Sequence, residues 1–296
     1  FGPGEAVAVM DLSVIIINYK TKSVTADCLN SLKKSSDKLT KEVILVDNGS
    51  GDGSVESLKH KFPWVKVYAA GRNLGFAGGN NFGFKRSRGK YIWLLNSDTL
   101  VKADTIQKLY DAALANDFVI ASCRLLNQNG SIQPQGGYLP DLWRLAAWML
   151  FIDDLPIISA FFPAYHVNRR SYFKKDQHPG WLAGTALLIR RDVYQRLKGF
   201  DNHIFMYGED VEFCLRAKKL GFRPDYFAGP RLTHLGQASG SSRQAILGEY
   251  RGLKYIYQKH FSGWQQRALK FLLKLGALLR VIILRNKIYD EAKSLA

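Results

Sequence analysis

The sequence predicts an α/β protein with a mostly parallel central sheet flanked by helices and a C-terminal amphipathic helical extension. Two observations predict the sheet. Short apolar runs such as 13–18 are rich in β-branched residues, and segments with helical character separate these runs. Strands that alternate with helices are typical of βαβ units, which place the strands parallel. The 296 residues, 47% of them hydrophobic, suffice for one large domain or two small ones.

The expected elements follow one another from residue 13 onward. The apolar run 42–46 leads into Asp47, Asn48, Gly49 and Ser50, a strong turn signal. Pro63 is expected to end the helix before it, because proline cannot continue a helix. We expect strands over 13–18, 42–46, 65–69, 91–95 and 182–189, and helices over 24–33, 54–62, 75–86 and 211–220.

The chain divides into segments of different composition. Residues 1–9, FGPGEAVAV, are expected to be a tag remnant, with the native chain starting at Met10. Residues 10–125 and 126–262 are expected to form the two halves of the α/β unit. The second half contains an apolar insert, 134–180, that carries five prolines and is long for a simple connection.

The C-terminal segment 263–296 is apolar but carries basic residues throughout. The charges interrupt it too often for a membrane-spanning helix, which requires about 20 apolar residues in a row. A basic amphipathic helix at a membrane interface fits the pattern and is our expectation. The alternative is a helix packed on the domain with solvated lysines.

The net charge of +17 and the pI of about 9.7 indicate an anionic partner: nucleic acid, an acidic membrane surface or a phosphorylated substrate. Nucleic acid is not expected, because no zinc-finger, basic-zipper or RNA-binding aromatic motif accompanies the charge.

The three cysteines, Cys28, Cys123 and Cys214, form no CxxC pair. Free thiols in a reducing cytosolic compartment are therefore expected.

The apolar run YIWLL opens onto Asn96, Ser97 and Asp98. Ligands of α/β sheets bind outside the carboxyl ends of the strands, and a carboxylate there can hold a divalent cation with a diphosphate. The alternative is a polar turn that caps the next helix. Asp47 follows another expected strand and is suited either to a nucleotide or to an Asx-turn.

Two further clusters are candidate sites. The glycine-rich segment 71–81 allows close backbone approach to a ligand, although it lacks the GK[ST] of a phosphate-binding P-loop and also suits a flexible loop. Glu209, Asp210 and Glu212 begin an expected helix, where acidic residues are common. Asp210 is also placed to act as a general base. His234 suits a core position or a metal site.

Taken in order, the segments SVIIINY, VDNGS, NLGFAGGNN, LLNSD, GTALLIRR and GED resemble the family 2 glycosyltransferases. The resemblance covers roughly residues 12–239. It implies a GT-A fold, a nucleotide-sugar donor, a divalent metal and inversion at the transferred sugar. The pair NLGFAGGNN and LLNSD resembles the branch that contains rhamnosyltransferases and galactofuranosyltransferases of bacterial surface polysaccharides.

The resemblance also implies roles for single residues. Asp98 matches the metal-binding position of the DxD motif, whose first Asp is Asn96 here, and His234 matches a histidine that joins the metal or the diphosphate in some relatives. Asp210 matches the catalytic base, and Gly184, in WLAGT, is expected to leave room for the sugar. The resemblance implies nucleotide contacts at two places. Tyr19 and Asp47 are expected at the nucleobase, and the glycine-rich segment 71–81 is expected to contribute Asn73, Phe76, Ala77 and Asn81.

The implied reaction moves L-rhamnose from dTDP-L-rhamnose, with UDP-galactofuranose, UDP-galactose and UDP-N-acetylglucosamine left open. Mg²⁺ or Mn²⁺ is the expected cofactor. The acceptor is expected to be linked to a polyprenyl diphosphate at the cytoplasmic membrane face, because the insert is aromatic and the C-terminal segment basic. A sugar-phosphate nucleotidyltransferase needs a glycine-rich loop after the first strand, which Asn18, Tyr19 and Lys20 do not provide. A non-catalytic membrane scaffold would not need Asp98 and Asp210.

Overall fold

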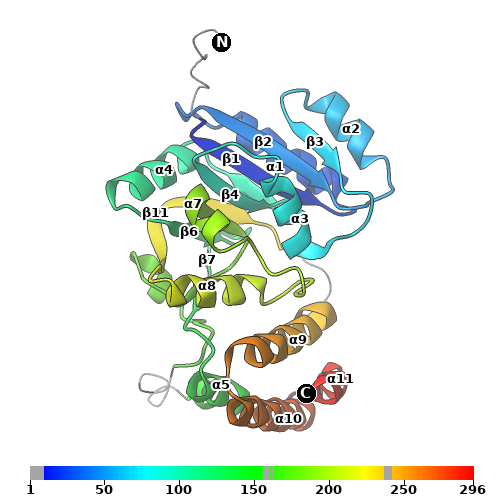
Figure 1. The fold of residues 1–296 in the computed structure, drawn as a ribbon, viewed down its shortest axis with the longest axis vertical. Helices are drawn as coiled ribbons and strands as arrows, with labels where there is room; N and C mark the ends of the chain where they lie inside the picture. The colour runs from blue at the N-terminus through cyan, green and yellow to red at the C-terminus, as the bar shows by residue number, and fades with distance from the viewer. Residues whose placement is uncertain (1–9, 156–160, 162, 237–241) are drawn as a thin grey trace.

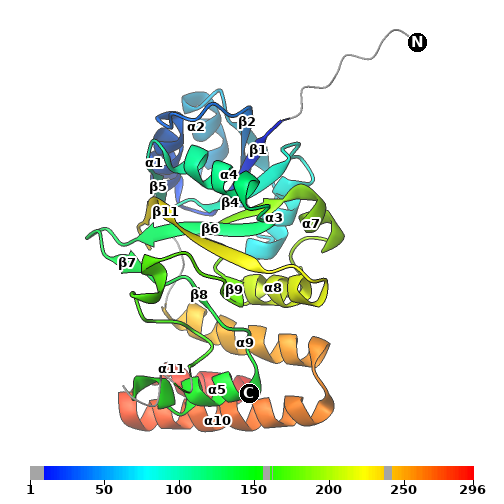
Figure 2. The same cartoon turned by 90° about the vertical axis from the view of Figure 1, so that its left-hand side faces the viewer.

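The computed structural model describes residues 10–155, 161, 163–236 and 242–296. Figures 1 and 2 show a sheet with its covering helices, and beneath it a layer formed by the insert helix and the C-terminal helices. This lower layer contains α5 (Leu142–Met149), α9 (Ser242–His260), α10 (Gly263–Leu284) and α11 (Ile288–Leu295). The expected tag remnant, 1–9, lies outside the described residues.

The large sheet has the strand order β3-β2-β1-β4-β10-β6-β11-β5, and β7 pairs with β6. In its first half β3, β2, β1 and β4 are all parallel, with Asn18 beside Asp47 and Ile17 beside Asn96. The ends of these strands therefore meet at one edge. Its strands are β1 (Leu12–Asn18), β2 (Lys41–Asp47), β3 (Lys66–Ala69), β4 (Tyr91–Asn96), β5 (Thr99–Val101), β6 (Ile120–Leu126), β7 (Ile132–Gln133), β10 (Ala186–Arg190) and β11 (Pro224–His234).

Helices cover both faces of the sheet, which explains the continuous apolar runs of its strands. In β1, Val14 and Ile16 belong to one core cluster and Ile15 to the other. The first cluster includes side chains of α1 (Lys22–Lys33), α2 (Ser54–Lys61) and α4 (Thr105–Ala115). The second includes side chains of α3 (Gly75–Phe84), α7 (Arg191–Arg196), α8 (Glu209–Lys219) and the lower layer. The α/β fold class is confirmed.

The second half of the sheet differs from the expectation in two ways. Strand β10 runs antiparallel to both β4 and β6, so parallel pairing is complete only in the first half. The single strand expected over 182–189 is two strands, because β9 (Trp181–Leu182) pairs with β8 (Gly136–Gly137) in a separate small sheet. Between β9 and β10 the chain crosses to the large sheet, where the Thr185 carbonyl accepts a hydrogen bond from Asn96 N.

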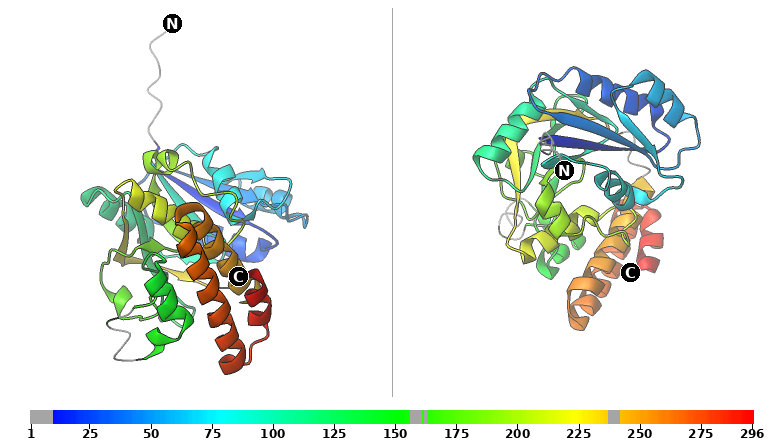
Figure 3. Two further views of the ribbon diagram at one scale, coloured as in Figure 1. Left: turned by 60° about the horizontal axis from the view of Figure 1, so that its bottom comes forward. Right: turned by 45° about the horizontal axis from the view of Figure 1, so that its top comes forward.

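The C-terminal segment is two helices, since α10 ends at Arg285 in a left-handed conformation (φ 51°) and α11 follows. Figure 3 shows α10 between α5 and α11, and α10 packs against both. The Arg280 side chain is buried and donates hydrogen bonds to the carbonyls of Trp148 and Met149, which tie α10 to the end of α5. No helix among the described residues has the length and apolar character needed to cross a membrane.

Candidate active site

A cavity of about 370 Å³ lies at the edge where β1 and β4 end. Its volume falls within the range of small-molecule sites. The turn after β4, the starts of α3 and α8, the β9–β10 connection and the middle of α9 all contribute to its lining. Of the expected site residues, it is lined by Tyr19, Asn73, Phe76, Asn96, Asp98, Gly184 and Asp210. Asp47, Ala77, Asn81 and His234 do not line it.

Asp98 and His234 meet at the end of β4. Strand β11 pairs with β5 so that His234 lies opposite Thr99, and His234 Nε2 is 3.1 Å from Asp98 Oδ1. Both side chains are buried. Gln133 Oε1, 2.9 Å from His234 Nδ1, favours the tautomer with hydrogen on Nδ1, so that a lone pair on Nε2 faces Asp98.

This pair fits a divalent metal. Two donor atoms 3.1 Å apart can both lie about 2.1 Å from one ion, and a Gln133 partner on the second ring nitrogen orients the imidazole as metal-bound histidines require. The described residues contain no cluster of three or more His, Cys, Asp or Glu side chains that could hold a metal. The remaining ligands would therefore come from a bound diphosphate and water, as is usual for Mg²⁺.

The turn after β2 holds the loop that begins α3. Asn48 accepts a hydrogen bond from Leu74 N and donates to Asn73 Oδ1 and to the Gly75 carbonyl. Asn73 Oδ1 also accepts a bond from Gly75 N. These bonds fix Asn73 at the wall of the cavity, and the neighbouring Phe76, whose N donates to the Phe205 carbonyl, also lines it. Tyr19, 42% exposed, offers its ring at the end of β1.

Three of the expected nucleotide contacts serve the fold in this structure. Asp47 is buried and accepts hydrogen bonds from Asn18 Nδ2 and from Ser50 N, three residues on, so it holds the turn after β2. Ala77 is fully buried in the core. The Asn81 amide accepts two hydrogen bonds and donates two, to groups from Tyr194, Phe200 and Asn202. With both donors and its oxygen engaged, Asn81 holds the 200–202 loop.

Asp210 is held by backbone donors at the start of α8. Gly184 N donates to its Oδ2 at 3.1 Å and Val211 N to its Oδ1 at 2.8 Å. Burial raises the pKa of Asp210, and these hydrogen bonds oppose the rise. Burial and the charge of Asp210 raise the pKa of the adjacent Glu209 well above its usual range. The two backbone donors favour the ionised form of Asp210, whereas Glu209 Oε2 is buried without a hydrogen-bond partner.

Gly184 lines the cavity, and the absence of a side chain there also serves the local packing. A Cβ at this position would lie 2.8 Å from the Phe76 ring, and Phe76 itself lines the cavity. The missing side chain therefore makes room for the ring of Phe76 as well as for the hydrogen bond to Asp210. That Gly184 also leaves room for the sugar stays a prediction.

The cavity also contains polar residues that the sequence did not single out. Tyr165 and His166 come from the insert 134–180, and Glu249 comes from α9. Glu249 Oε1 accepts hydrogen bonds from the Tyr165 hydroxyl and from His166 Nε2. No spacing motif marks these residues, because more than 80 positions separate the two segments and only the tertiary fold brings them together.

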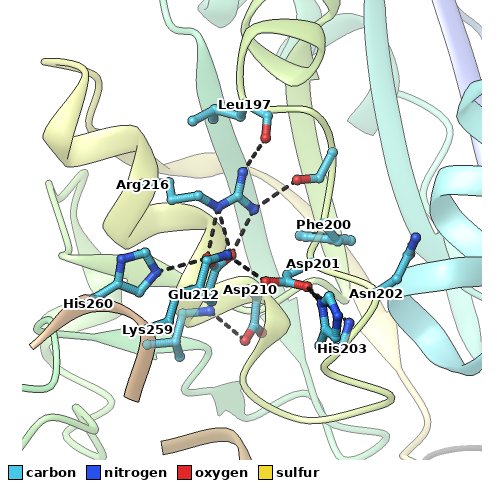
Figure 4. Close-up of polar contacts among 12 residues, drawn as sticks. Leu197, Phe200, Asp201, Asn202, His203, Asp210, Glu212, Arg216, Lys259 and His260 are labelled. Atoms are coloured by element: carbon cyan, nitrogen blue, oxygen red, sulfur yellow. Dashed lines mark hydrogen bonds and ion pairs between the residues drawn. The ribbon is translucent and has the colours of Figure 1, made fainter. Parts of the chain in front are cut away.

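A buried ionic network anchors the helix that carries Asp210 (Figure 4). Glu212, fully buried on α8, accepts hydrogen bonds from Arg216, Lys259 and His260. Burial acts to raise the pKa of Glu212, and these partners outweigh it, so the pKa is lowered. Arg216 also donates to the carbonyls of Leu197 and Gly199. The network thus joins α8 to the end of α9 and to the loop before α8.

Known proteins resemble the chain in sequence and in fold. N-acetylglucosaminyl-diphospho-decaprenol L-rhamnosyltransferase of Mycobacterium tuberculosis (strain ATCC 25618 / H37Rv) is 27% identical over 291 residues, 91% of each chain. Rhamnosyltransferase WbbL of Escherichia coli (strain K12) is 24% identical over 54% of this chain and 60% of its own. Cholesterol galactosyltransferase of Borreliella burgdorferi (strain ATCC 35210 / DSM 4680 / CIP 102532 / B31) is 29% identical over 73% and 58%.

A crystal structure of GalNAc-T7 with UDP, GalNAc and Mn²⁺ superposes with a TM-score of 0.63 at 15% identity, over 97% of this chain and 55% of the other. The chain thus spans about half of that protein and shares its GT-A fold. The sequence profile described as Glycosyl transferase family 2 matches residues 13–197, more than half of the chain. The chain therefore belongs to glycosyl transferase family 2.

Proposed function

We propose that this glycosyltransferase moves a sugar from a nucleoside-diphosphate sugar to a hydroxyl of a lipid-linked glycan, with inversion at the anomeric carbon. One observation carries the proposal: a single cavity brings together the carboxylate that faces His234 and a second carboxylate held by backbone donors. The first, Asp98, is suited to a metal-bound diphosphate. The second, Asp210, is suited to a proton transfer.

In the proposed reaction the acceptor oxygen attacks the anomeric carbon from the face opposite the diphosphate. The new C–O bond forms as the bond to the diphosphate oxygen breaks, and the hydroxyl proton passes to Asp210. Mg²⁺ or Mn²⁺ held by Asp98 and His234 would neutralise charge on the departing diphosphate. The chain itself orients Asp210 through hydrogen bonds from Gly184 N and Val211 N, and burial together with the charge of Asp210 raises the pKa of the neighbouring Glu209.

The proposed donor is dTDP-L-rhamnose, because two relatives are named rhamnosyltransferases. A thermal-shift panel with Mn²⁺ tests it against UDP-galactofuranose, UDP-galactose and UDP-N-acetylglucosamine. A ligand at 100 times its Kd stabilises the folded state by about 2.7 kcal/mol, so the correct donor raises the Tm most. Asp98→Asn is expected to remove the metal-dependent part of the shift, whereas Asp104→Asn, in an exposed pair, is expected to leave it unchanged. A larger shift with a UDP sugar would replace the donor assignment.

The proposed acceptor, linked to a polyprenyl diphosphate, places the enzyme peripherally at the cytoplasmic face of the membrane. One relative is named for a decaprenol-linked glycan. The α10 helix combines the two roles considered from its sequence: Leu269, Leu273 and Ala277 pack on the protein, while another face stays exposed. This exposed outer face consists of Trp264, Phe271, Leu278 and Ile282.

The outer face of α10 is suited to an anionic bilayer surface. Its members recur at intervals of seven and four residues, so they form one row along the helix. Exposed Arg267, Lys270 and Lys274 flank the row, in a chain of net charge +17. Trp143, 74% exposed, adds an aromatic ring from α5, which packs beside α10. Apolar insertion and attraction to acidic lipids then act together.

Replacing Trp264, Phe271, Leu278 and Ile282 together by Gln is expected to weaken binding to vesicles of phosphatidylglycerol and phosphatidylcholine by roughly tenfold or more. Each large apolar side chain moved out of water contributes about 1.5–3 kcal/mol. Flotation measures the bound fraction. The matched control, Leu114→Gln with Leu220→Gln, changes exposed leucines on other helices. If the α10 variant floats as the wild type does, α10 does not form the membrane surface.

A further inference from the structure

Tyr165, His166 and Glu249 form a second polar group in the cavity that holds Asp210, and neither the donor nor the metal accounts for them. Glu249 Oε1 accepts hydrogen bonds from both Tyr165 and His166. The His166 and Glu249 side chains keep 27% and 24% of their surface exposed, and both line the cavity. A small molecule in the cavity can therefore reach both side chains.

The group lies close to the base. Tyr165, His166 and Glu249 line the same cavity as Asp210. Trp181 lies three residues before Gly184, which donates to Asp210, and its ring centroid is 5.4 Å from that of His166 and 5.8 Å from that of Tyr165. The edge formed by β1, β4 and α3 is the proposed donor side. The acceptor hydroxyl must come within hydrogen-bond reach of Asp210. The cavity residues near Asp210 that belong to other elements are therefore assigned to the acceptor.

The chemistry of the group suits a sugar. Burial acts to raise the pKa of Glu249, but the charge of His166 and the two hydrogen bonds outweigh burial, so the pKa is lowered and the side chain is a carboxylate. A carboxylate and an imidazole are strong hydrogen-bond partners for hydroxyl groups. The adjoining rings of Trp181 and Tyr165 also line the cavity, and their apolar surface suits the apolar face of a pyranose.

We propose that His166 and Glu249, with the Trp181 ring beside them, bind the acceptor sugar and position its hydroxyl against Asp210. This inference rests on the proposed function. It assigns acceptor recognition to the insert and to α9, and α9 lies beyond residue 197, where the match to the family profile ends. The acceptor sugar is thus bound by different elements from those that bind the donor.

Steady-state kinetics of Glu249→Gln and His166→Asn test this assignment, with dTDP-L-rhamnose as donor and N-acetylglucosaminyl-diphospho-decaprenol as acceptor. Each variant is expected to lower kcat/KM for the acceptor by about 10–100-fold, the loss typical of a hydrogen bond to a charged group. Hydrolysis of the donor by water is expected to stay within about twofold of the wild type, since no acceptor takes part. The double variant is expected to lose little more than Glu249→Gln alone, because the two residues act as a pair.

The chain supplies a matched control. His178 Nδ1 lies 2.6 Å from Asp225 Oδ1, in another histidine–carboxylate pair, and neither of these two residues lines the cavity. His178→Asn is therefore expected to leave both activities unchanged. Tyr165→Phe removes only one hydroxyl and is expected to weaken the acceptor in the same direction, which keeps the test informative if Glu249→Gln folds poorly.

Two results would overturn the assignment: equal loss of transfer and donor hydrolysis in the variants, or an unchanged kcat/KM for the acceptor in all of them. Either result leaves the proposed glycosyl transfer intact, because the wild type still turns over. A wild-type chain that neither transfers nor hydrolyses any nucleotide sugar overturns the proposed function instead, and this inference with it.

Discussion

Asp210→Asn is expected to lower the rate of glycosyl transfer by about 10²–10⁴-fold, the usual contribution of a general base. The amide keeps the shape of the side chain and can still accept a hydrogen bond from Gly184 N or Val211 N, which hold the carboxylate now. It cannot take a proton from the acceptor hydroxyl. Donor binding is expected to survive, so the thermal shift with nucleotide sugar stays near that of the wild type.

The neighbouring carboxyl group is the matched control. Glu209 lies on the same turn, is buried, and has a pKa raised well above its usual range by burial and by the charge of Asp210. The raised pKa favours the neutral form of Glu209, and Glu209→Gln puts a neutral side chain of the same shape in its place. The rate of glycosyl transfer by Glu209→Gln is expected to stay within about threefold of the wild type, because Asp210 remains to take the proton.

The pH dependence has a definite sign. Asp210 works as a base only when ionised, and burial raises its pKa above the ordinary value of 3.8. The rate is therefore expected to be full above this raised pKa and to fall as the pH drops through it, so the acidic limb of the pH profile of kcat lies above the range of a solvated Asp.

An Asp210→Asn enzyme that keeps more than a tenth of the wild-type rate would disprove the assignment of Asp210 as the general base.

The first half of the sheet could be predicted because its signal is local. The runs that become β1, β2 and β4 are apolar throughout, since helices cover both faces, and each ends in polar turn residues. Strand direction has no such signal. The antiparallel run of β10 depends on the path that the chain takes through β9 and the small sheet, and Gly184 lies in that crossing.

The site could be predicted only where one segment carries the chemistry. Asp98 and Asp210 each stand at the end or start of an element, and the order of motifs connects them. The contact of Asp98 with His234 depends on the pairing of β11 with β5. The contact of His166 with Glu249 depends on how the insert packs against α9. Neither pairing leaves a spacing pattern in the sequence. The partners of the Asn81 amide are likewise distant in sequence, so its hydrogen bonds within the fold could not be predicted either.

Glu212→Gln is expected to destabilise the protein by about 3–5 kcal/mol, the cost of removing one partner from a buried ion pair. Glu212 is fully buried, and its two oxygens accept hydrogen bonds from Arg216, Lys259 and His260 (Figure 4). The amide leaves the Arg216 guanidinium without its counter-charge. A fall in Tm of roughly 5–10 °C is expected, measured by calorimetry or thermal shift.

The control for Glu212→Gln is Asp104→Asn. Asp104 pairs with Lys108, but both side chains are more than half exposed, and such pairs contribute less than about 1 kcal/mol.

The pH dependence of the stability separates a charge effect of Glu212 from simple loss of packing. Because its partners hold the pKa of Glu212 below the ordinary value of 4.5, the stabilisation is complete above pH 4.5 and is lost as the pH falls through the lowered pKa. The wild type and Glu212→Gln should therefore converge in stability at acid pH, whereas a difference that persists there would assign the loss to packing.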